Sequence, residues 1–527
     1  MPEFELATID LVIVGLYVSM ILAIGFWVGR KSKDSESYFL AGRGMIWPLV
    51  GFSLVSANLS GTSYIGLAGA GYEDGIAVWN YEWMATLVLV FFALFILPFY
   101  LRSRVSTMPE FLACRYDKRS RYAFSIFSVF TALFIDSAGA LFAGGIVLKL
   151  LFPEVPLGLL ITAMALLGGI YVILGGLRAV MITDTIQAVL LYVAGAVIFF
   201  MLFRELGSWG AVREAAPEDG FTVFKPADDD FLPWPGVLTG VLWLGFYYWT
   251  TNHIVMQKVL SAKSIDHGRW GVLMAGFLQL PLLFLLILPG TMGRALYPDL
   301  PDSDLIWPML AFDFLPIGIR GLVLAALVAA LMSTLDSVLN GASSLVVNDF
   351  VKTRGKQRSE KQILLISRAM VGVFMIAAGL WAPVILTFDG IVEYFQSFLG
   401  YVTMPVVVIF LGGLFWYRAT ATAAFWTLVI AAPIGLAGFL AGEILELYQL
   451  QFLYGAGVML LLSLTLFVGI TLFSEPPERE ALKEYVWSRE AWREESRELA
   501  DKPLWKNYRV LAGLLAVVTV VWVALFI

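Results

Sequence analysis

Long apolar segments dominate the sequence and restrict the environment in which it can fold. Fourteen of them, mostly of 20 residues or more, are separated by short polar loops. A helix of roughly 20 apolar residues spans the hydrocarbon core of a bilayer, and a large soluble core would not produce such a series. With 59% hydrophobic and 14% charged residues among 527, the chain is also far more apolar than a soluble globular protein. The sequence therefore predicts an all-α, polytopic membrane protein.

The distribution of basic residues predicts how the spans are oriented. The predicted spans are 8–29, 46–72, 76–101, 121–150, 155–176, 181–205, 233–260, 268–293, 316–349, 362–384, 388–416, 419–443, 451–473 and 508–527. Lys and Arg fall in alternate loops, whereas the intervening loops are acidic or bare. The positive-inside rule places the basic loops in the cytoplasm and both termini outside it. The acidic N-terminus does not resemble a cleavable signal, so we expect the first span to stay in a cell membrane.

The second span contains an unusual polar stretch. Residues 54–71 read L-V-S-A-N-L-S-G-T-S-Y-I-G-L-A-G-A-G, with hydroxyl and amide side chains at 56–63, where the hydrocarbon should be deepest. Backbone groups freed at bilayer depth cost several kcal/mol each unless protein or a water-filled cavity satisfies them. The stretch therefore predicts a broken helix that lines a binding site.

A second interruption, G-F-Y-Y-W-T-T-N at 245–252, opens span seven. Spans two to six and seven to eleven form two groups of five, and an odd number inverts the second group. Interrupted helices at matching positions of two inverted halves predict a binding site at the bilayer midplane. The expected organisation is an extra helix (1–30), the two repeats (44–206 and 232–416), two peripheral helices (417–474), an amphipathic cytoplasmic linker (475–507) and a last helix (508–527).

Several polar or aromatic side chains near the interruptions are candidates for solute contact. Glu82 is a carboxylate in an otherwise apolar span, and such acids usually face a cavity. Asn58 offers a donor and an acceptor for a hydroxyl ligand, with helix capping as the alternative role. Tyr248 and Trp249 can stack on a ring or simply pack. Gln396 can contact the solute or only hydrogen-bond a neighbouring helix.

Span nine suggests an ion site. Ser333 and Thr334 present hydroxyls on a helix of Ala, Leu and Val, and hydroxyls with carbonyls freed at a break form a hard oxygen cage suited to sodium. Ordinary small-residue packing is the alternative. Asp336 should not share the face of Ser333, and we assign it no role. Asp184 is either a helix N-cap or a carboxylate on a sodium route.

Eight short motifs occur in a fixed order: S-L-V-S-A-N-L-S at 53–60, Y-E-W at 81–83, S-T-M-P-E-F-L-A-C-R-Y at 106–116, G-G-L-R-A-V-M-I-T-D-T-I-Q at 175–187, Y-Y-W-T-T-N-H-I-V-M-Q-K at 247–258, L-P-G at 288–290, A-L-M-S-T-L at 330–335 and Y-F-Q at 394–396. Together they resemble the sodium:solute symporter family and, within it, the sodium/glucose and sodium/galactose cotransporter branch. The resemblance covers residues 8–475 approximately.

This resemblance implies a LeuT-like core of two inverted five-helix repeats and a set of binding residues. It implies a sodium ion held by the backbone oxygens of Ser56, Leu59 and Ala330 and the hydroxyls of Ser333 and Thr334. It also implies, as in the sugar branch, that the solute meets Asn58, Glu82 and Gln396, with Tyr248 closing the inner side.

Three positions depart from the sugar branch: Ser63 where Gln or His is frequent, Gly245 where Asn can occur, and Gln279 where Lys is common. Ser63 and Gln279 remain candidate solute contacts. Some members bind a second sodium with an extra serine, and here that position is Ala330, which favours one ion. Asp184 leaves a second site open.

The expected activity is therefore sodium-coupled import of a sugar or polyol. Within the family, the alternatives are an amino acid, a monocarboxylate, a nucleoside or a vitamin. A membrane enzyme would need a nucleophile with a base or a cluster of carboxylates, and the acids at 82, 184 and 336 are dispersed. A membrane sensor would need a signalling module, which we do not find after the last predicted span. No feature suggests nucleic-acid binding.

Overall fold

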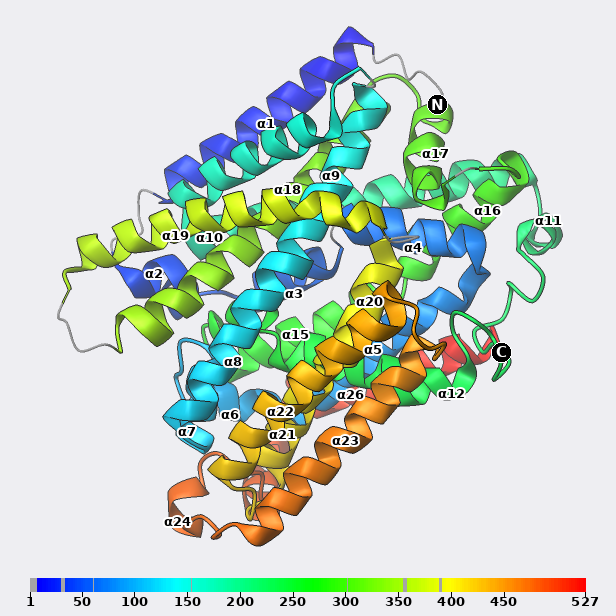
Figure 1. The fold of residues 1–527 in the computed structure, drawn as a ribbon. Helices are drawn as coiled ribbons and strands as arrows, with labels where there is room; N and C mark the ends of the chain where they lie inside the picture. Colours follow the sequence, from blue (N-terminus) through cyan, green and yellow to red (C-terminus); the bar gives the residue numbers. More distant parts are fainter. Residues whose placement is uncertain are drawn as a thin grey trace.

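The computed structural model describes residues 7–29, 34–59, 61–152, 154–300, 302–353, 358–387 and 391–527. Within these ranges the fold is helical, without a β-strand (Figure 1). The long helices run across one another in a bundle, and the shorter ones lie mainly at its periphery. The prediction of an all-α fold is confirmed.

The first half of the chain contains eleven α-helices in the described ranges. They are α1 (Thr8–Gly29), α2 (Ser35–Leu40), α3 (Trp47–Asn58), α4 (Gly61–Glu73), α5 (Asn80–Phe91), α6 (Leu97–Arg102), α7 (Met108–Arg115), α8 (Lys118–Thr131), α9 (Ala138–Leu151), α10 (Leu157–Leu206) and α11 (Trp209–Ala215). The short 3-10 segments η1 (Ala41–Arg43) and η2 (Gly75–Trp79) precede α3 and α5, and the π-helical segments η3 (Phe92–Ile96) and η4 (Ala132–Ser137) interrupt two spans.

The second group begins with an interrupted helix. It contains α12 (Trp234–Gly236), η5 (Val237–Val241), α13 (Leu242–Phe246), η6 (Tyr247–Thr251), α14 (His253–Leu260), α15 (Ile265–Gln279), η7 (Leu283–Ile287), α16 (Leu288–Leu296), η8 (Ser303–Leu305), α17 (Ile306–Phe314), α18 (Ile319–Leu345), η9 (Val346–Val351), α19 (Glu360–Trp381), η10 (Ala382–Thr387), α20 (Ile391–Val402) and α21 (Met404–Phe415). The remaining elements are α22 (Ala421–Phe439), η11 (Leu440–Ile444), α23 (Phe452–Phe473), α24 (Arg479–Leu482), α25 (Arg489–Ala500), η12 (Leu504–Lys506) and α26 (Tyr508–Ala524).

Both predicted interruptions are present. Helix α3 ends at Asn58, Leu59 has a non-helical backbone (φ −76°, ψ 59°), and α4 begins at Gly61. In the second case η6 ends at Thr251, Asn252 leaves the helix (ψ 120°), and its side chain accepts a hydrogen bond of 2.9 Å from the N–H of Ile254 at the start of α14. Polar residues at both positions satisfy backbone groups that the missing helical turns leave open.

Among the described residues, nine helices are long and apolar enough to cross a membrane. A tenth crossing is the pair Tyr394–Val402 and Met404–Phe415, bent by 50°. Broken helices such as α3 with α4 fall outside that test because each piece is short. The protein is thus a multi-pass membrane protein, and the count of fourteen spans stays a prediction.

Helix α10 joins two predicted spans through one glycine. Gly176 has φ 64° and ψ 177°, a conformation that L side chains rarely adopt. The predicted spans 155–176 and 181–205 meet at this residue, as expected from the G-G-L-R motif. Helix α10 packs against α3 and α18, so the kink positions the second half of α10 beside the first broken helix.

Close helix contact fixes the second half of the first broken helix. A Cβ atom on Gly290 of α16 would lie 1.9 Å from the carbonyl oxygen of Ala68 in α4, so only glycine fits. One residue further on, the Thr291 hydroxyl donates a hydrogen bond of 2.7 Å to the carbonyl oxygen of Gly71. Small residues allow such backbone approach between membrane helices.

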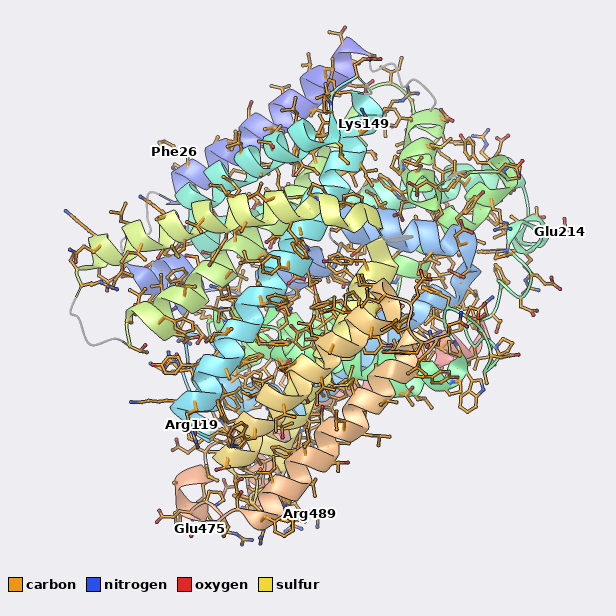
Figure 2. The ribbon with its side chains drawn as sticks, viewed as in Figure 1. Phe26, Arg119, Lys149, Glu214, Glu475 and Arg489 are labelled. Atoms are coloured by element: carbon orange, nitrogen blue, oxygen red, sulfur yellow. The ribbon has the colours of Figure 1, made fainter. Side chains whose placement is uncertain are left out.

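The linker 475–507 contains the predicted amphipathic helix as α25. Its Glu495 accepts a hydrogen bond of 2.6 Å from Arg269 of α15, and Trp492 stacks on Phe95 at 5.2 Å between ring centroids. Figure 2 shows Glu475 and Arg489 of this linker at the same end of the bundle as Arg119. Phe26, by contrast, projects outward from α1 at the side of the bundle, as a lipid-facing residue would.

Candidate solute and ion site

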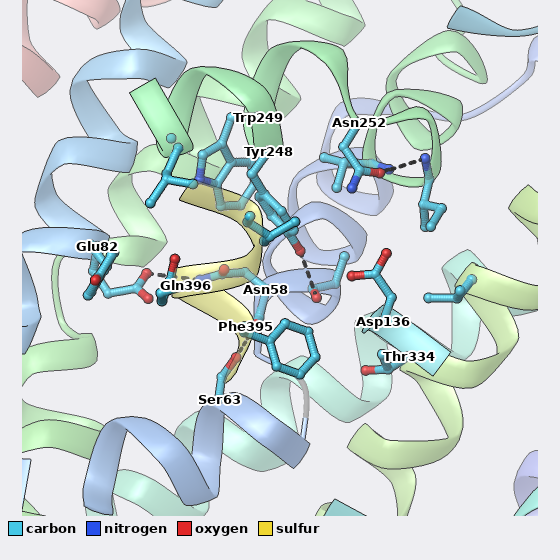
Figure 3. A pocket seen from close by; sticks show the side chains of 18 of the residues that line it. Asn58, Ser63, Glu82, Asp136, Tyr248, Trp249, Asn252, Thr334, Phe395 and Gln396 are labelled. Atoms are coloured by element: carbon cyan, nitrogen blue, oxygen red, sulfur yellow. Dashed lines mark hydrogen bonds between the residues drawn. The ribbon is translucent and has the colours of Figure 1, made fainter. Parts of the chain in front are cut away.

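A cavity of about 170 Å³ lies where the two broken helices meet. Its walls come from α3, α4, α5, η4, η6, α14, α18 and α20, and the side chains are shown in Figure 3. The lining residues are Ala57, Asn58, Ser63, Leu67, Tyr81, Glu82, Asp136, Val241, Leu244, Gly245, Tyr248, Trp249, Asn252, Ile254, Val255, Thr334, Ser337, Val338, Phe395, Gln396 and Leu399. Elements far apart in sequence thus converge on one small space.

One end of the cavity is a polar cluster. The Asn58 amide donates hydrogen bonds of 2.9 Å to Oε2 of Glu82 and 3.2 Å to Oε1 of Gln279. Glu82 lines the cavity, as does Gln396 beside it (Figure 3). Gln279 is fully buried behind Asn58 and is not among the lining residues. Its predicted contact with the solute is therefore indirect in this conformation, and it stays a prediction.

Side chains satisfy two carbonyl groups at the end of α3. The hydroxyl of Tyr248 donates a hydrogen bond of 3.0 Å to the carbonyl oxygen of Ala57. The hydroxyl of Ser63, one turn into α4, donates to the carbonyl oxygen of Asn58. The second broken helix is in this way tied to the first at the break itself. Tyr248 occupies a position that can close one side of the cavity, as the resemblance implies.

Aromatic side chains form the apolar wall of the cavity. The rings of Tyr248 and Trp249 meet edge to face at 5.0 Å. Phe395, next to Gln396 on α20, approaches the backbone so closely that a Cβ on Gly139 would lie 2.2 Å from its Cε2 atom. One apolar face opposite a few polar groups is the usual composition of a small-molecule site.

The predicted ion ligands come from two helices that pack together, α3 and α18. Thr334 lines the cavity and donates a hydrogen bond of 3.1 Å to the carbonyl oxygen of Ala330, so the lone pairs of its hydroxyl oxygen remain available to a cation. Ser56 and Leu59 are buried on the other side of this contact, at the end of α3. The side chain of Ser333 lies outside the described residues. The donor set is hard and neutral, which fits sodium.

Asp184 lies outside the cavity lining and already has a cationic partner. The Lys258 ammonium is 2.8 Å from Oδ2 of Asp184, and both side chains are fully buried. The same ammonium donates a hydrogen bond of 2.9 Å to the carbonyl oxygen of Ser53, whose hydroxyl donates to Asp184. A sodium ion there would share the carboxylate with a lysine, and the predicted sodium role of Asp184 stays a prediction.

The sequence analysis missed Asp136, Ser337 and Phe395, which also line the cavity. Asp136 is the only acid in the predicted span 121–150, and the reasoning that selected Glu82 would have selected it too. Ser337 carries a common residue type and gives no comparable signal. Phe395 adjoins the Y-F-Q motif but is one of 39 phenylalanines, so its type alone does not mark it.

Sequence comparison places this site in a known family. The model of the sodium:solute symporter family matches residues 38–431. The chain belongs to this family. Among curated relatives of this symporter, sodium/glucose cotransporter 4 of Danio rerio is 30% identical over 556 residues, covering 95% of this chain and 84% of that protein. Sodium/myo-inositol cotransporter 2 of Homo sapiens is 30% identical over 538 residues, covering 92% and 80%. Family membership makes the protein a transporter rather than an enzyme, with sodium as its coupling ion.

Solved structures show that the symporter shares its fold with other transporters. A Na⁺-coupled sialic acid symporter in a substrate-bound outward-open state matches with a TM-score of 0.77 at 22% identity, covering 90% of this chain and 100% of that one. Mhp1, a nucleobase-cation-symport-1 family transporter in a closed conformation, matches with a TM-score of 0.56 at 13% identity, covering 86% and 98%. At these identities the likeness concerns the fold alone, and it confirms the predicted LeuT-like class.

Proposed function

We propose that the protein imports a sugar or a polyol together with sodium. The observation that carries this proposal is the chemistry of the cavity: Asn58, Glu82 and Gln396 offer amide and carboxylate groups, and none of the described lining residues is Lys, Arg or His. Amides donate to and accept from hydroxyl groups, whereas a carboxylate only accepts from them. Such a site suits a neutral solute rich in hydroxyl groups.

The size of the cavity supports a solute with one six-membered ring. An apolar protein cavity of about 150 Å³ holds one benzene molecule, and this cavity measures about 170 Å³. Tyr248, Trp249 and Phe395 offer flat apolar surfaces for the ring faces, while the hydroxyl edge faces the polar cluster. The curated relatives named for glucose and myo-inositol agree with a compact ring of this kind.

Anionic solutes fit poorly. A monocarboxylate would lie near the carboxylates of Glu82 and Asp136 without a basic side chain among the described lining residues. Like charges at close range in a weakly polar site repel strongly. Amino acids and nucleosides, the other solutes open within the family, lack this objection but need their own recognition groups for a carboxylate or a base.

Coupling follows from the shared first broken helix. The proposed ion ligands Ser56 and Leu59 and the proposed solute ligand Asn58 belong to the same few residues of the chain. Filling either site orders that segment for the other, and such coupling is reciprocal. We further propose that the groups 44–206 and 232–416 are inverted repeats that rock about this point in alternating access.

The sodium gradient can drive substantial accumulation. One charge crossing 100 mV releases about 2.3 kcal/mol, and a tenfold sodium gradient adds about 1.4 kcal/mol. The total of about 3.7 kcal/mol for each ion corresponds to several-hundred-fold solute accumulation. Even one ion for each solute would therefore suffice for uptake from a dilute medium.

Uptake into proteoliposomes tests the proposal. The purified chain is reconstituted with an inward sodium gradient and supplied with radiolabelled sugars, cyclic polyols, amino acids and monocarboxylates. We expect uptake of one or more members of the first two classes, abolished when choline replaces sodium. Sugar uptake that persists in choline would refute the coupling, and uptake confined to amino acids or acids would refute the solute class.

Cysteine accessibility tests the orientation that we infer from the basic loops. Arg119 and the linker residues Glu475 and Arg489 lie at one end of the bundle, which we assign to the cytoplasm (Figure 2). A variant in which Cys114 is replaced by Ser carries single cysteines at Arg489 or at exposed Ile527. In intact cells we expect an impermeant thiol reagent to label the second position only.

A further inference from the structure

A carboxylate that the proposed function leaves unused lies inside the cavity. Asp136 lies in η4, the π-helical segment between α8 and α9, and this span runs from Lys118 to Lys149. It is thus far from either end of its span, where a charge is costly and is retained for function. No hydrogen-bond donor or cation among the described residues contacts its carboxylate. Single π-helical turns frequently occur at functional sites.

The backbone around Asp136 is held in place by the helix that carries Gln396. The hydroxyl of Tyr394 in α20 donates a hydrogen bond of 2.8 Å to the carbonyl oxygen of Phe134 in η4. Tyr394 is almost fully buried. The π-helical turn is therefore anchored to the neighbouring helix, and the position of Asp136 relative to the cavity is fixed by packing.

Helix α18 presents hydroxyl oxygens to the same part of the cavity. It packs directly against η4, and Thr334 and Ser337 both line the cavity with Asp136. Figure 3 shows the Asp136 carboxylate beside Thr334. Ser337 is only 3% exposed, and its hydroxyl has no hydrogen-bond partner within the described part of the chain. A buried hydroxyl without a partner is costly, so its presence beside a carboxylate points to a missing ligand.

We propose that Asp136 and Ser337 bind a second sodium ion, distinct from the ion proposed at Ser333 and Thr334. A carboxylate with hydroxyl oxygens is a hard ligand set that suits sodium rather than a soft metal. The ion supplies the positive charge that the Asp136 carboxylate otherwise lacks. Because Asp136 shares the cavity with the proposed solute ligands, the second ion is positioned to be coupled to solute binding. This inference rests on the proposed sodium-coupled function.

Counting bound sodium tests the inference without the solute. Binding of ²²Na⁺ to the purified full chain is measured at saturation for the wild type, Asp136→Asn, Asp136→Glu and Ser337→Ala. We expect two ions for the wild type and for Asp136→Glu, which keeps the charge, and one ion for Asp136→Asn. For Ser337→Ala we expect weaker binding of one of the two ions, by about tenfold, as the loss of one hydrogen-bonding group to a charge suggests.

Ser343→Ala is the matched control. Ser343 is a fully buried serine of the same helix, but its hydroxyl donates to the carbonyl oxygen of Ser367 and it does not line the cavity. We expect this variant to bind two ions with wild-type affinity. If Asp136→Asn does not fold, Ser337→Ala and Asp136→Glu, each compared with Ser343→Ala, still decide the question through the affinity of the second ion.

Several outcomes would overturn the inference. One ion in the wild type, two in Asp136→Asn, or an equal effect of Ser343→Ala would each do so. Unchanged sodium counts with a raised solute KM in Asp136→Asn would make Asp136 a solute ligand instead. Proton movement that accompanies uptake and disappears in Asp136→Asn would make it a proton site. Failure of sugar uptake with two bound sodium ions would refute the proposed solute but not this site.

Discussion

The Asn58 amide and the Glu82 carboxylate are joined by a hydrogen bond of 2.9 Å across the cavity end where α3 breaks. The bond uses Oε2 of Glu82, and no donor among the described residues reaches Oε1. The second amide contact, to Gln279, holds Asn58 from behind at 3.2 Å. Glu82 is thus oriented by one partner and retains an oxygen that can accept a hydroxyl hydrogen from a solute.

Replacing Glu82 by Gln should weaken solute binding while preserving the shape of the site. A hydrogen bond to a charged group contributes about 1.5–3 kcal/mol and a neutral one about 0.5–1.5 kcal/mol. We therefore expect a rise of about tenfold in the solute KM, measured as sodium-driven uptake in proteoliposomes. Glu205→Gln, at an exposed position of α10, is the control and should leave KM unchanged. Equal KM values for Glu82→Gln and the wild type would exclude contact with the solute.

The hydroxyl pair on α18 should determine sodium affinity. We expect the double substitution Ser333→Ala and Thr334→Ala to raise the sodium concentration for half-maximal uptake by tenfold or more, because each hydroxyl that binds a cation contributes about 1.5–3 kcal/mol. Thr519→Ala is the matched control, since Thr519 is a buried threonine that donates to the carbonyl four residues earlier, as Thr334 does, but lies in α26. Full sodium dependence in the double variant would refute this ion site.

The sequence was informative wherever a polar residue stood out against an apolar helix. The breaks at Asn58 and Asn252 and the carboxylate of Glu82 could be predicted because backbone and charge are costly at membrane depth, so each exception marks a site. Asp136 obeys the same rule and was missed only because no motif surrounded it. These features are local, and a single span contains all the information needed to detect them.

Pairings between distant residues could not be predicted in this way. Whether Gln279 faces the solute or supports Asn58 depends on how α15 is rotated against α3, which residue types do not specify. The partnership of Asp184 with Lys258 joins residues 74 positions apart, and the sequence gave each of them only a local interpretation. Ser337 likewise acquires meaning only because α18 packs against η4.

Acidification should release α25 from α15. Although burial favours its neutral form, contacts with Arg269, Tyr508 and Arg509 lower the pKa of Glu495 below its usual value of 4.5. The stabilisation is therefore complete above pH 4.5 and is lost as the pH falls through the lowered pKa. Hydrogen exchange of the Arg489–Ala500 amides should accelerate in that acidic range.

Two variants of α25 check the cause of this release. In Glu495→Gln the amides of α25 should already exchange fast at neutral pH, with little further change on acidification. Glu498→Gln removes an exposed carboxylate of the same helix and should behave as the wild type. Equal acid sensitivity of the wild type and Glu495→Gln would assign the release to another group.

The buried pair of Lys258 and Asp184 provides a test that separates stability from transport. Removing one member of a buried ion pair leaves an uncompensated charge and costs about 3–5 kcal/mol, whereas replacing both by apolar residues is often neutral. We expect Lys258→Met to lower the free energy of unfolding in detergent by that amount, and Lys258→Met with Asp184→Leu to restore it. A double variant as unstable as the single one would show that the carboxylate or the ammonium has a further essential partner. If the restored double variant retains sodium-driven uptake, Asp184 is a structural residue. If it is stable but transports nothing, the carboxylate lies on the sodium route, and Lys258 must release it during the cycle, because an ammonium and a sodium ion cannot both occupy one carboxylate oxygen at 2.8 Å.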